Sequence, residues 1–213
     1  MKKNVYSITL FEDVVDAVDR AAYKNNMTRS GFINAVLAEY LGLVTPEVRR
    51  DNIFDEISAL LSPDETFLIY PRSADSLFTA KSSIRFKYNP TIRYSVGIYP
   101  ASDEYFGELR VSLRTRNPLL LSALESFLSL WQRAEFAFFG ERLSVADSAR
   151  FIRKLRTPRY SSPEALGKSA ADYIRLFNDC LTAHFNMYPD ISSSAEYSSS
   201  RLADYCRRSS EVV

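Results

Sequence analysis

The first forty residues constrain the fold of this chain most strongly, because they predict elements that cannot form a core by themselves. Residues 4–10 alternate in character, with Tyr6, Ile8 and Leu10 facing one way. This period of two predicts a strand with one apolar face. A lone strand has no partner for its backbone groups, and so short a segment buries too little apolar surface to fold alone. We therefore expect two copies of the chain to pair through this segment.

Two helices are predicted after the strand. Acidic residues crowd the start of the first helix, where they complement the helix dipole, and Asn25-Asn26 ends it. Thr28 is the expected N-cap of the second helix, which ends at Gly42. Apolar residues recur at helical spacing in both helices, namely at Val14, Val15, Val18, Ala21, Ala22, Phe32, Ile33, Val36, Leu37, Tyr40 and Leu41.

Residues of about 2–43 resemble the ribbon-helix-helix family of DNA-binding proteins, to which Arc and MetJ belong. The resemblance is carried by Ser7-Ile8-Thr9-Leu10, by the acidic start of the first helix, and by Met27-Thr28-Arg29-Ser30 before the second apolar stripe. It implies an obligate homodimer whose paired strands enter the major groove of double-stranded DNA. It covers about a fifth of the chain. Val5 departs from the family pattern, which often has a basic residue among the outward strand positions.

The resemblance assigns two sets of DNA-contacting residues. Base edges would be contacted from the outward side of the strand by Val5, Ser7 and Thr9. Phosphate would be contacted by Lys3, Thr28, Arg29 and Ser30. The alternative is a half-buried strand with a polar face, followed by an ordinary N-cap. The pair Arg29-Ser30 directly after the helix break favours DNA binding.

The remaining length predicts a second domain. At 213 residues the chain is α+β by pattern, with a ribbon-helix-helix domain at 1–43, an α+β domain at 46–187, and a disordered serine-rich tail at 188–213 in which a short helix near 202–206 could survive. The formal net charge of +1 means that any affinity for nucleic acid must come from local clusters of charge. The 2 cysteines suit a reducing cytoplasm, and we expect neither a signal peptide nor a membrane span.

Within this second domain we expect an antiparallel meander packed on helices. Strands are predicted at 67–70, 83–88, 92–99 and 108–114. Helices are predicted from Pro46 to about Leu61, from Pro118 to Phe139, from Ser144 to about Leu155, and from Pro163 to Phe185.

Basic residues gather on one predicted face of the sheet and in the segment that follows it. They are Arg85, Lys87, Arg93, Arg110, Arg114, Arg150, Arg153 and Lys154. Contact with phosphate, nucleic acid or an acidic partner is one interpretation. A solvated sheet face is the other, and we favour it for the strand residues. For residues 150–154 a solvated helix end and a phosphate contact are evenly balanced.

Catalysis finds little support in the sequence. The chain has 1 histidine, His184, and no nucleophile–base pair, glycine-rich phosphate loop or metal-ligand spacing. We therefore predict a protein that is not an enzyme and that needs no cofactor or metal.

The predicted function is sequence-specific binding of double-stranded DNA by a homodimer, as a transcriptional repressor. A plasmid partition or conjugation accessory protein is the alternative within DNA binding. An RNA-binding or scaffold protein that uses the basic sheet face is the alternative of another class. The second domain would bind a partner or a small effector, or form higher oligomers.

Overall fold

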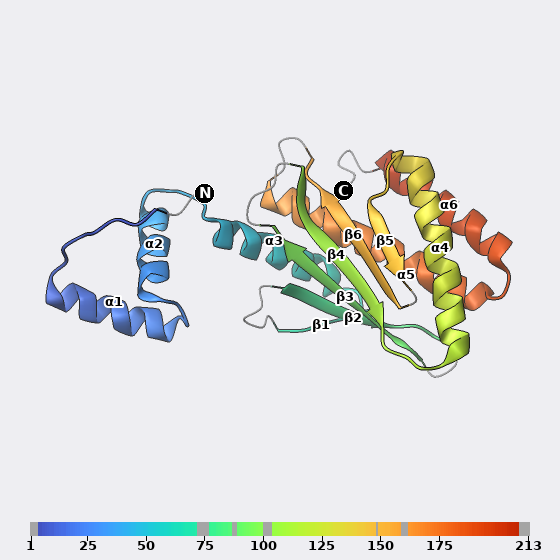
Figure 1. The fold of residues 1–213 in the computed structure, drawn as a ribbon, viewed down its shortest axis with the longest axis horizontal. Helices are drawn as coiled ribbons and strands as arrows, with labels where there is room; N and C mark the ends of the chain where they lie inside the picture. The colour runs from blue at the N-terminus through green and yellow to red at the C-terminus, as the bar shows by residue number, and fades with distance from the viewer. Residues whose placement is uncertain are drawn as a thin grey trace. The chain divides into compact units, whose positions relative to one another are not determined.

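The computed structural model describes residues 4–71, 77–86, 89–99, 104–147, 149–158 and 162–208. The chain divides into two compact units, residues 1–51 (unit 1) and residues 52–213 (unit 2). Across the described ranges it contains six helices and one six-stranded antiparallel sheet (Figure 1). The predicted α+β class is therefore confirmed.

Unit 1 contains helices α1 (Glu12–Lys24) and α2 (Arg29–Tyr40) and the start of α3 (Pro46–Leu61). The Thr28 hydroxyl oxygen caps α2 by accepting from the backbone N–H of Gly31 at 3.1 Å. Asn26 and Gly42 adopt left-handed backbone angles, with φ of 51° and 66°, after α1 and α2 respectively. The two helices and their ends thus agree with the prediction.

The predicted strand at residues 4–10 is absent from the single chain, whose first described element is α1. The physical reason is the lack of a partner, because a strand forms only when another strand satisfies its backbone groups. Unit 1 offers no other strand among its described residues. As a result the apolar side chains of the segment stay in solvent, with Tyr6 80% and Ile8 62% exposed.

Unit 2 is organised around the sheet, whose strand order is β1-β2-β3-β4-β6-β5. The strands are β1 (Phe67–Ile69), β2 (Leu77–Ser83), β3 (Thr91–Ile98), β4 (Tyr105–Leu113), β5 (Ser144–Asp147) and β6 (Arg150–Arg156). The helices that follow the meander are α4 (Pro118–Phe139), α5 (Pro163–Met187) and α6 (Ile191–Arg208). Strands β1 to β4 form the expected meander, and β6 then pairs with β4, which leaves β5 at the edge.

The core of unit 2 lies between one face of the sheet and the helices. Phe177 of α5 is at its centre, with its ring 4.8 Å from that of Phe151 on β6 and 5.3 Å from that of Phe127 on α4. Two buried hydroxyls on this face of the sheet are satisfied, because Ser82 and Tyr94 both donate to Asn178 Oδ1. We call this the inner face of the sheet, and the opposite face the outer face.

One predicted strand is misplaced. The second strand runs from Leu77 to Ser83 and not over residues 83–88. Its inward side carries Phe78, Ala80 and Ser82, and this small and partly polar set gives a weaker apolar alternation than residues 84–88 do. Residues 87–88, which include Lys87, lie outside the described residues.

The helix predicted from Ser144 to about Leu155 is wrong, because these residues form the β5–β6 hairpin. Asp147 does not complete a capping box; its carboxylate accepts from the backbone N–H of Ala149 at 3.2 Å in the turn. Burial along β6 alternates with a period of two, with Phe151, Arg153 and Leu155 buried. The mixture of basic and apolar residues at 150–156 is compatible with the period of a helix or of a strand, and pairing with β4 favours the strand.

The disordered tail predicted at 188–213 is also wrong for its described part. Residues 191–208 form α6, which buries Ser194, Ser198, Leu202 and Tyr205. These positions are four, four and three residues apart, so they share one helical face. Serine content indicated disorder, but serine is small enough to let α6 lie close to its neighbours.

Candidate nucleic-acid interfaces

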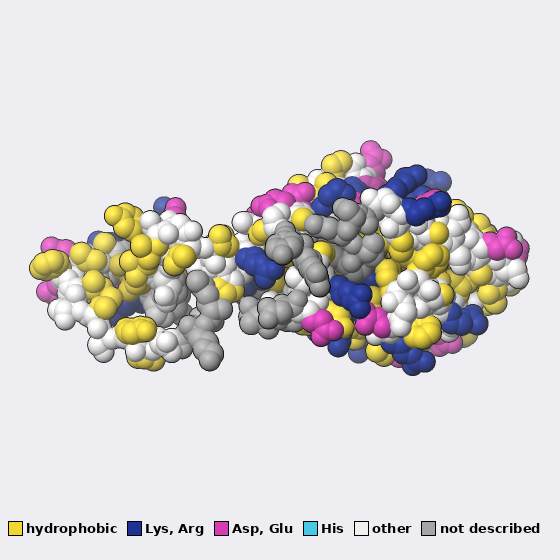
Figure 2. Space-filling view, turned by 90° about the horizontal axis from the view of Figure 1, so that it is seen from above, with side chains coloured by type: hydrophobic (Ala, Val, Ile, Leu, Met, Phe, Trp, Pro, Cys, Tyr) yellow, Lys and Arg dark blue, Asp and Glu magenta, His cyan; other side chains and the backbone are white. Residues whose placement is uncertain are grey.

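Most of the apolar surface of unit 1 is left uncovered. Among its described residues only Ala22 and Ala38 are buried. Figure 2 shows many hydrophobic side chains on the face of this unit that is in view. The exposed members of the predicted apolar stripes, which we call the unit 1 apolar set, are Tyr6, Ile8, Leu10, Val14, Val36, Leu37, Tyr40 and Leu41. Large exposed apolar patches mark interaction sites in proteins generally, so this set is a candidate interface.

The predicted base-contacting residues Val5, Ser7 and Thr9 are all exposed, Val5 by 99%. Since residues 4–10 form no strand in the single chain, the structure brings these three side chains to no common face. Lys3 lies outside the described residues.

The predicted phosphate-contacting residues at the start of α2 have a partner that the sequence did not reveal. Arg29 Nε donates to Asp19 Oδ1 at 2.5 Å, and a second guanidinium nitrogen donates to Oδ2. This two-pronged ion pair links α2 to α1 and lowers the pKa of Asp19, chiefly through the hydrogen bonds. Thr28 is occupied as the N-cap, and Ser30 is exposed. Arg29 therefore has a structural contact besides its predicted one.

The outer face of the sheet carries the second predicted set. Strand register places Lys81 of β2 beside Arg93 of β3, Arg93 beside Ser112 of β4, and Ser112 beside Arg150 of β6. Three cations thus lie in one row across four strands. Lys81 belonged to no predicted strand, so the sequence prediction missed it.

A groove of about 720 Å³ runs along this row. We call it the basic groove and define it by four cationic and three hydroxyl side chains, Lys81, Arg93, Arg114, Arg150, Thr91, Ser112 and Thr115. None of the described residues that line it is acidic. Within the described ranges, Arg93, Arg114 and Arg150 form no ion pair with a carboxylate. Lys81 Nζ donates to the Tyr70 hydroxyl oxygen at 2.9 Å.

Three other predicted basic residues lie outside the groove. Arg110 forms an ion pair with Glu108 on its own strand, and Lys154 Nζ lies 4.8 Å from the centre of the Tyr105 ring. Arg85 is exposed in the turn after β2.

The prediction that Arg153 belongs to a basic surface is wrong, because its side chain points to the inner face of the sheet and is 0% exposed. Its partner is Glu135 of α4, at 2.6 Å. It is available neither to phosphate nor to solvent.

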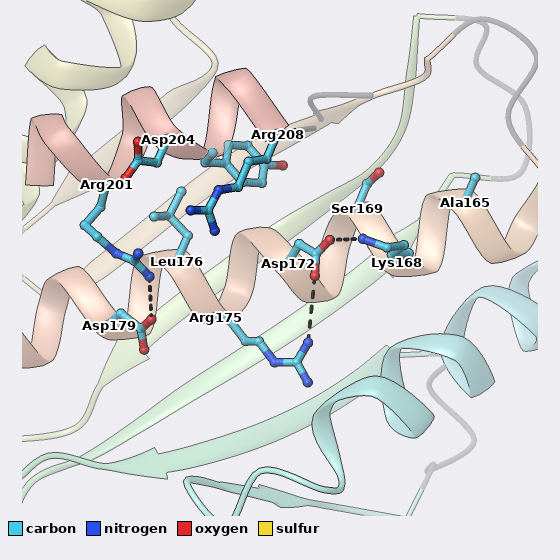
Figure 3. Close-up of a pocket in the computed structure, with 11 residues that line it drawn as sticks. Ala165, Lys168, Ser169, Asp172, Arg175, Leu176, Asp179, Arg201, Asp204 and Arg208 are labelled. Atoms are coloured by element: carbon cyan, nitrogen blue, oxygen red, sulfur yellow. Dashed lines mark hydrogen bonds and ion pairs between the residues drawn. The ribbon is translucent and has the colours of Figure 1, made fainter. Parts of the chain in front are cut away.

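A second pocket, of about 580 Å³, lies between α5 and α6 (Figure 3). Its charges are of both signs: Asp172 pairs with Lys168 and lies 3.8 Å from Arg175, and Arg201 pairs with Asp179 at 3.2 Å. Such a lining offers no uniform field to a charged ligand, so the basic groove is the better candidate site.

His184 has a structural role. It is buried, and its Nε2 lies 3.0 Å from the carbonyl oxygen of Ala123 on α4, which can only accept. Nε2 therefore carries the proton, and Nδ1 accepts from the Ser194 hydroxyl at 2.6 Å on α6. The imidazole thereby joins three helices.

In the part of the chain that the structure describes, no group of three or more metal-ligating side chains is found. No described helix combines the length and apolar character needed to cross a membrane. Comparison of the chain with family models, with curated proteins and with solved structures found no match. Function is therefore inferred from the residues and their geometry.

Proposed function

We propose that the protein binds double-stranded DNA in a sequence-specific manner as a homodimer, and that it represses transcription. Two copies would pair their residues 4–10 as antiparallel strands and enclose the unit 1 apolar set between four helices. The observation that carries the proposal is the exposure of this set on an otherwise regular helix pair.

A second copy removes the two deficiencies of unit 1 together. It supplies the missing strand partner for residues 4–10, and it covers apolar side chains that are worth roughly 1.5–3 kcal/mol each when fully buried. A monomer gains neither the strand pairing nor the burial of these side chains. This explains why residues 4–10 have the sequence pattern of a strand and yet lie in solvent.

Pairing would also create the DNA-reading surface. In two antiparallel strands with Tyr6, Ile8 and Leu10 inward, the side chains of Val5, Ser7 and Thr9 point outward together. Two hydroxyls and a methyl-bearing side chain match the hydrogen-bonding edges and the thymine methyl of the major groove. The backbone N–H groups at the start of α2 provide phosphate contacts that fix the register.

The test is a measurement of oligomeric state and DNA affinity on the full chain. Ile8→Asp and Val36→Asp should each give a monomer that no longer discriminates the preferred site from random DNA, because the dimer would bury an unpaired charge. Ile191→Asp is the control, since Ile191 is 45% exposed in unit 2 and Val36 is 46% exposed. A wild-type chain that sediments as a folded monomer, or an Ile8→Asp variant that keeps its site preference, would overturn the proposal.

Mapping of bound sites in the source genome separates the uses of such a dimer. One or two promoter sites support the repressor. Clusters of repeats beside a transfer or replication origin would instead indicate a partition or conjugation accessory protein.

A further inference from the structure

We propose that the basic groove of unit 2 binds the phosphate backbone of duplex DNA without reading its sequence. This gives unit 2 a DNA contact of its own, separate from the one proposed for unit 1. Only the choice of DNA over other polyphosphates rests on the function proposed for unit 1.

The row of cations is the first support. Neighbouring strands lie about 4.8 Å apart, so Lys81 and Arg93 are directly adjacent and Arg150 is about 10 Å beyond Arg93. Arg114, just after β4, adds a fourth positive charge to the same groove. Like charges this close repel one another unless an anion lies between them, and a groove of one sign concentrates the field.

An ordinary solvated or edge-protecting role does not explain these residues. Basic side chains often blunt the exposed edges of sheets, but β3 and β4 are central strands with partners on both sides. A solvated face also tends to mix both signs of charge, as in the pocket between α5 and α6. The described lining of the basic groove has one sign only, and the acidic side chain of the same row, Asp147, lies beyond the groove on β5, opposite Arg150.

The chemistry of the lining favours phosphate over bases. Arginine presents a planar fork of donors that matches phosphate oxygens, and three hydroxyls supply further donors. The described lining contains no aromatic side chain on which a base could stack. The groove therefore suits the backbone, which positions a protein on DNA without specifying sequence.

The length of the row favours a polymer over one phosphate group. From β2 to β6 the row spans three strand spacings, about 14 Å in all. Duplex DNA carries one negative charge for about every 1.7 Å of its axis, so several phosphates can face the groove at once. One inorganic phosphate can meet only part of it.

The experiment is a titration of random duplex DNA at several salt concentrations, using the full chain. Arg93→Gln/Arg150→Gln is compared with Arg133→Gln/Arg142→Gln, which removes the same charge from exposed positions outside the groove. Loss of two phosphate contacts should reduce the slope of log K against log[salt] by about 1.8, since each contact contributes about 0.9. The control pair should leave the slope unchanged. All four arginines are exposed or solvent-facing, and urea unfolding of each variant verifies that the fold is kept.

The same pair of substitutions placed in the Ile8→Asp chain separates this proposal from the previous one. The groove lies within a single chain, so random-DNA binding should persist in Ile8→Asp and should still depend on Arg93 and Arg150. An unchanged slope in the groove variant overturns the groove proposal even if the dimer proposal holds. It is also overturned if polyglutamate of equal charge competes as well as DNA, if duplex RNA binds the groove more tightly than DNA, or if inorganic phosphate saturates it without displacing DNA.

Discussion

Arg153 on β6 and Glu135 on α4 form an ion pair inside the core of unit 2, with Arg153 Nε 2.6 Å from Glu135 Oε1. The side chains are 0% and 2% exposed. The hydroxyl of Tyr173 donates to the same oxygen at 2.5 Å, and the hydroxyl of Ser144 donates to Oε2 at 2.7 Å. Burial and the adjacent Glu135 carboxylate raise the pKa of Tyr173, so it remains a donor. Four elements thus meet at one carboxylate.

Removal of one partner of this pair should destabilise unit 2. Arg153→Met or Glu135→Gln is expected to cost about 3–5 kcal/mol, because the remaining group keeps its desolvation penalty. The double variant Arg153→Met/Glu135→Gln should cost less than the sum of these two single changes. Urea unfolding followed by the fluorescence of Trp131, which donates to Tyr173, measures all three. An Arg153→Met chain that is as stable as wild type but weaker in DNA binding would contradict the assignment of Arg153 to the core.

The Arg29–Asp19 pair provides a test of whether Arg29 contacts phosphate. Arg29→Ala removes both the link between α1 and α2 and the proposed contact, so it should weaken binding to preferred and random DNA by a similar factor. Asp19→Asn is the matched control, because it breaks the link but leaves the guanidinium free. The control should retain or increase DNA affinity. Equal losses in the two variants would show that Arg29 acts only through the helix pair.

In the proposed dimer, the outward side chains of residues 4–10 should determine sequence preference. Ser7→Ala or Thr9→Ala is expected to cost about 1–3 kcal/mol on the preferred site and little on random DNA, because base contacts specify and phosphate contacts position. Parallel titrations on the two DNAs give the comparison. Equal weakening on both would remove Thr9 from the base-reading set.

His184 should make stability depend on pH in the mildly acidic range. Burial lowers the pKa of His184 below 6.5, although its hydrogen bond to Ala123 acts in the opposite direction. The unfolded chain therefore takes up a proton near pH 6.5 before the folded chain does, so this contribution is fully present above that pH and declines as the pH falls. The free energy of unfolding should fall more between pH 7.5 and 5.5 for wild type than for His184→Gln. Parallel curves would mean that the pKa of His184 is the same in the folded and the unfolded chain.

A side chain at Gly167 should destabilise the packing of α5 on α3. A Cβ at this position of α5 would lie 2.8 Å from the carbonyl oxygen of Ile53 and 2.6 Å from Cβ of Glu56, both on α3. Since backbone cannot yield as a flexible side chain does, Gly167→Ala should cost about 1–3 kcal/mol despite alanine's higher helix propensity. Lys168→Ala, one residue further along and exposed, is the control in the same unfolding measurement.

Local chemistry determined how well each element was predicted. The ends of α4 were predictable because the Asn117 side chain accepts from Leu119, Pro118 begins the helix and Gly140 takes the left-handed conformation after it. The β5–β6 hairpin was not predictable, because its residues are equally compatible with a helix and only pairing with β4 makes them a strand. The serine-rich segment of α6 was not predictable as a helix either, because its helical structure depends on the surface against which it packs.

The residues of the candidate site were also predicted only in part. Arg93, Arg114 and Arg150 were identified as basic surface, but their meeting in one groove depends on the register of three strands. Register is set by contacts between residues that are far apart in sequence, so a single sequence leaves it open. The burial of Arg153 depended on Glu135, eighteen residues earlier on another element.

The position of α5 has a consequence for synthesis of the chain. Its apolar side covers the inner face of a sheet whose last strand ends at Arg156, so this part of the cover is translated after every strand. Until Phe177 has left the ribosome, the rings of Tyr94, Phe127 and Phe151 lack their common neighbour. Unit 1 emerges first, and under the dimer proposal it would meet a second nascent chain during this interval. Under the same proposal, a message cut short before the codon for Pro163 would yield a product that pairs through unit 1 while its sheet lacks α5, and such a product would carry wild-type chains into aggregates.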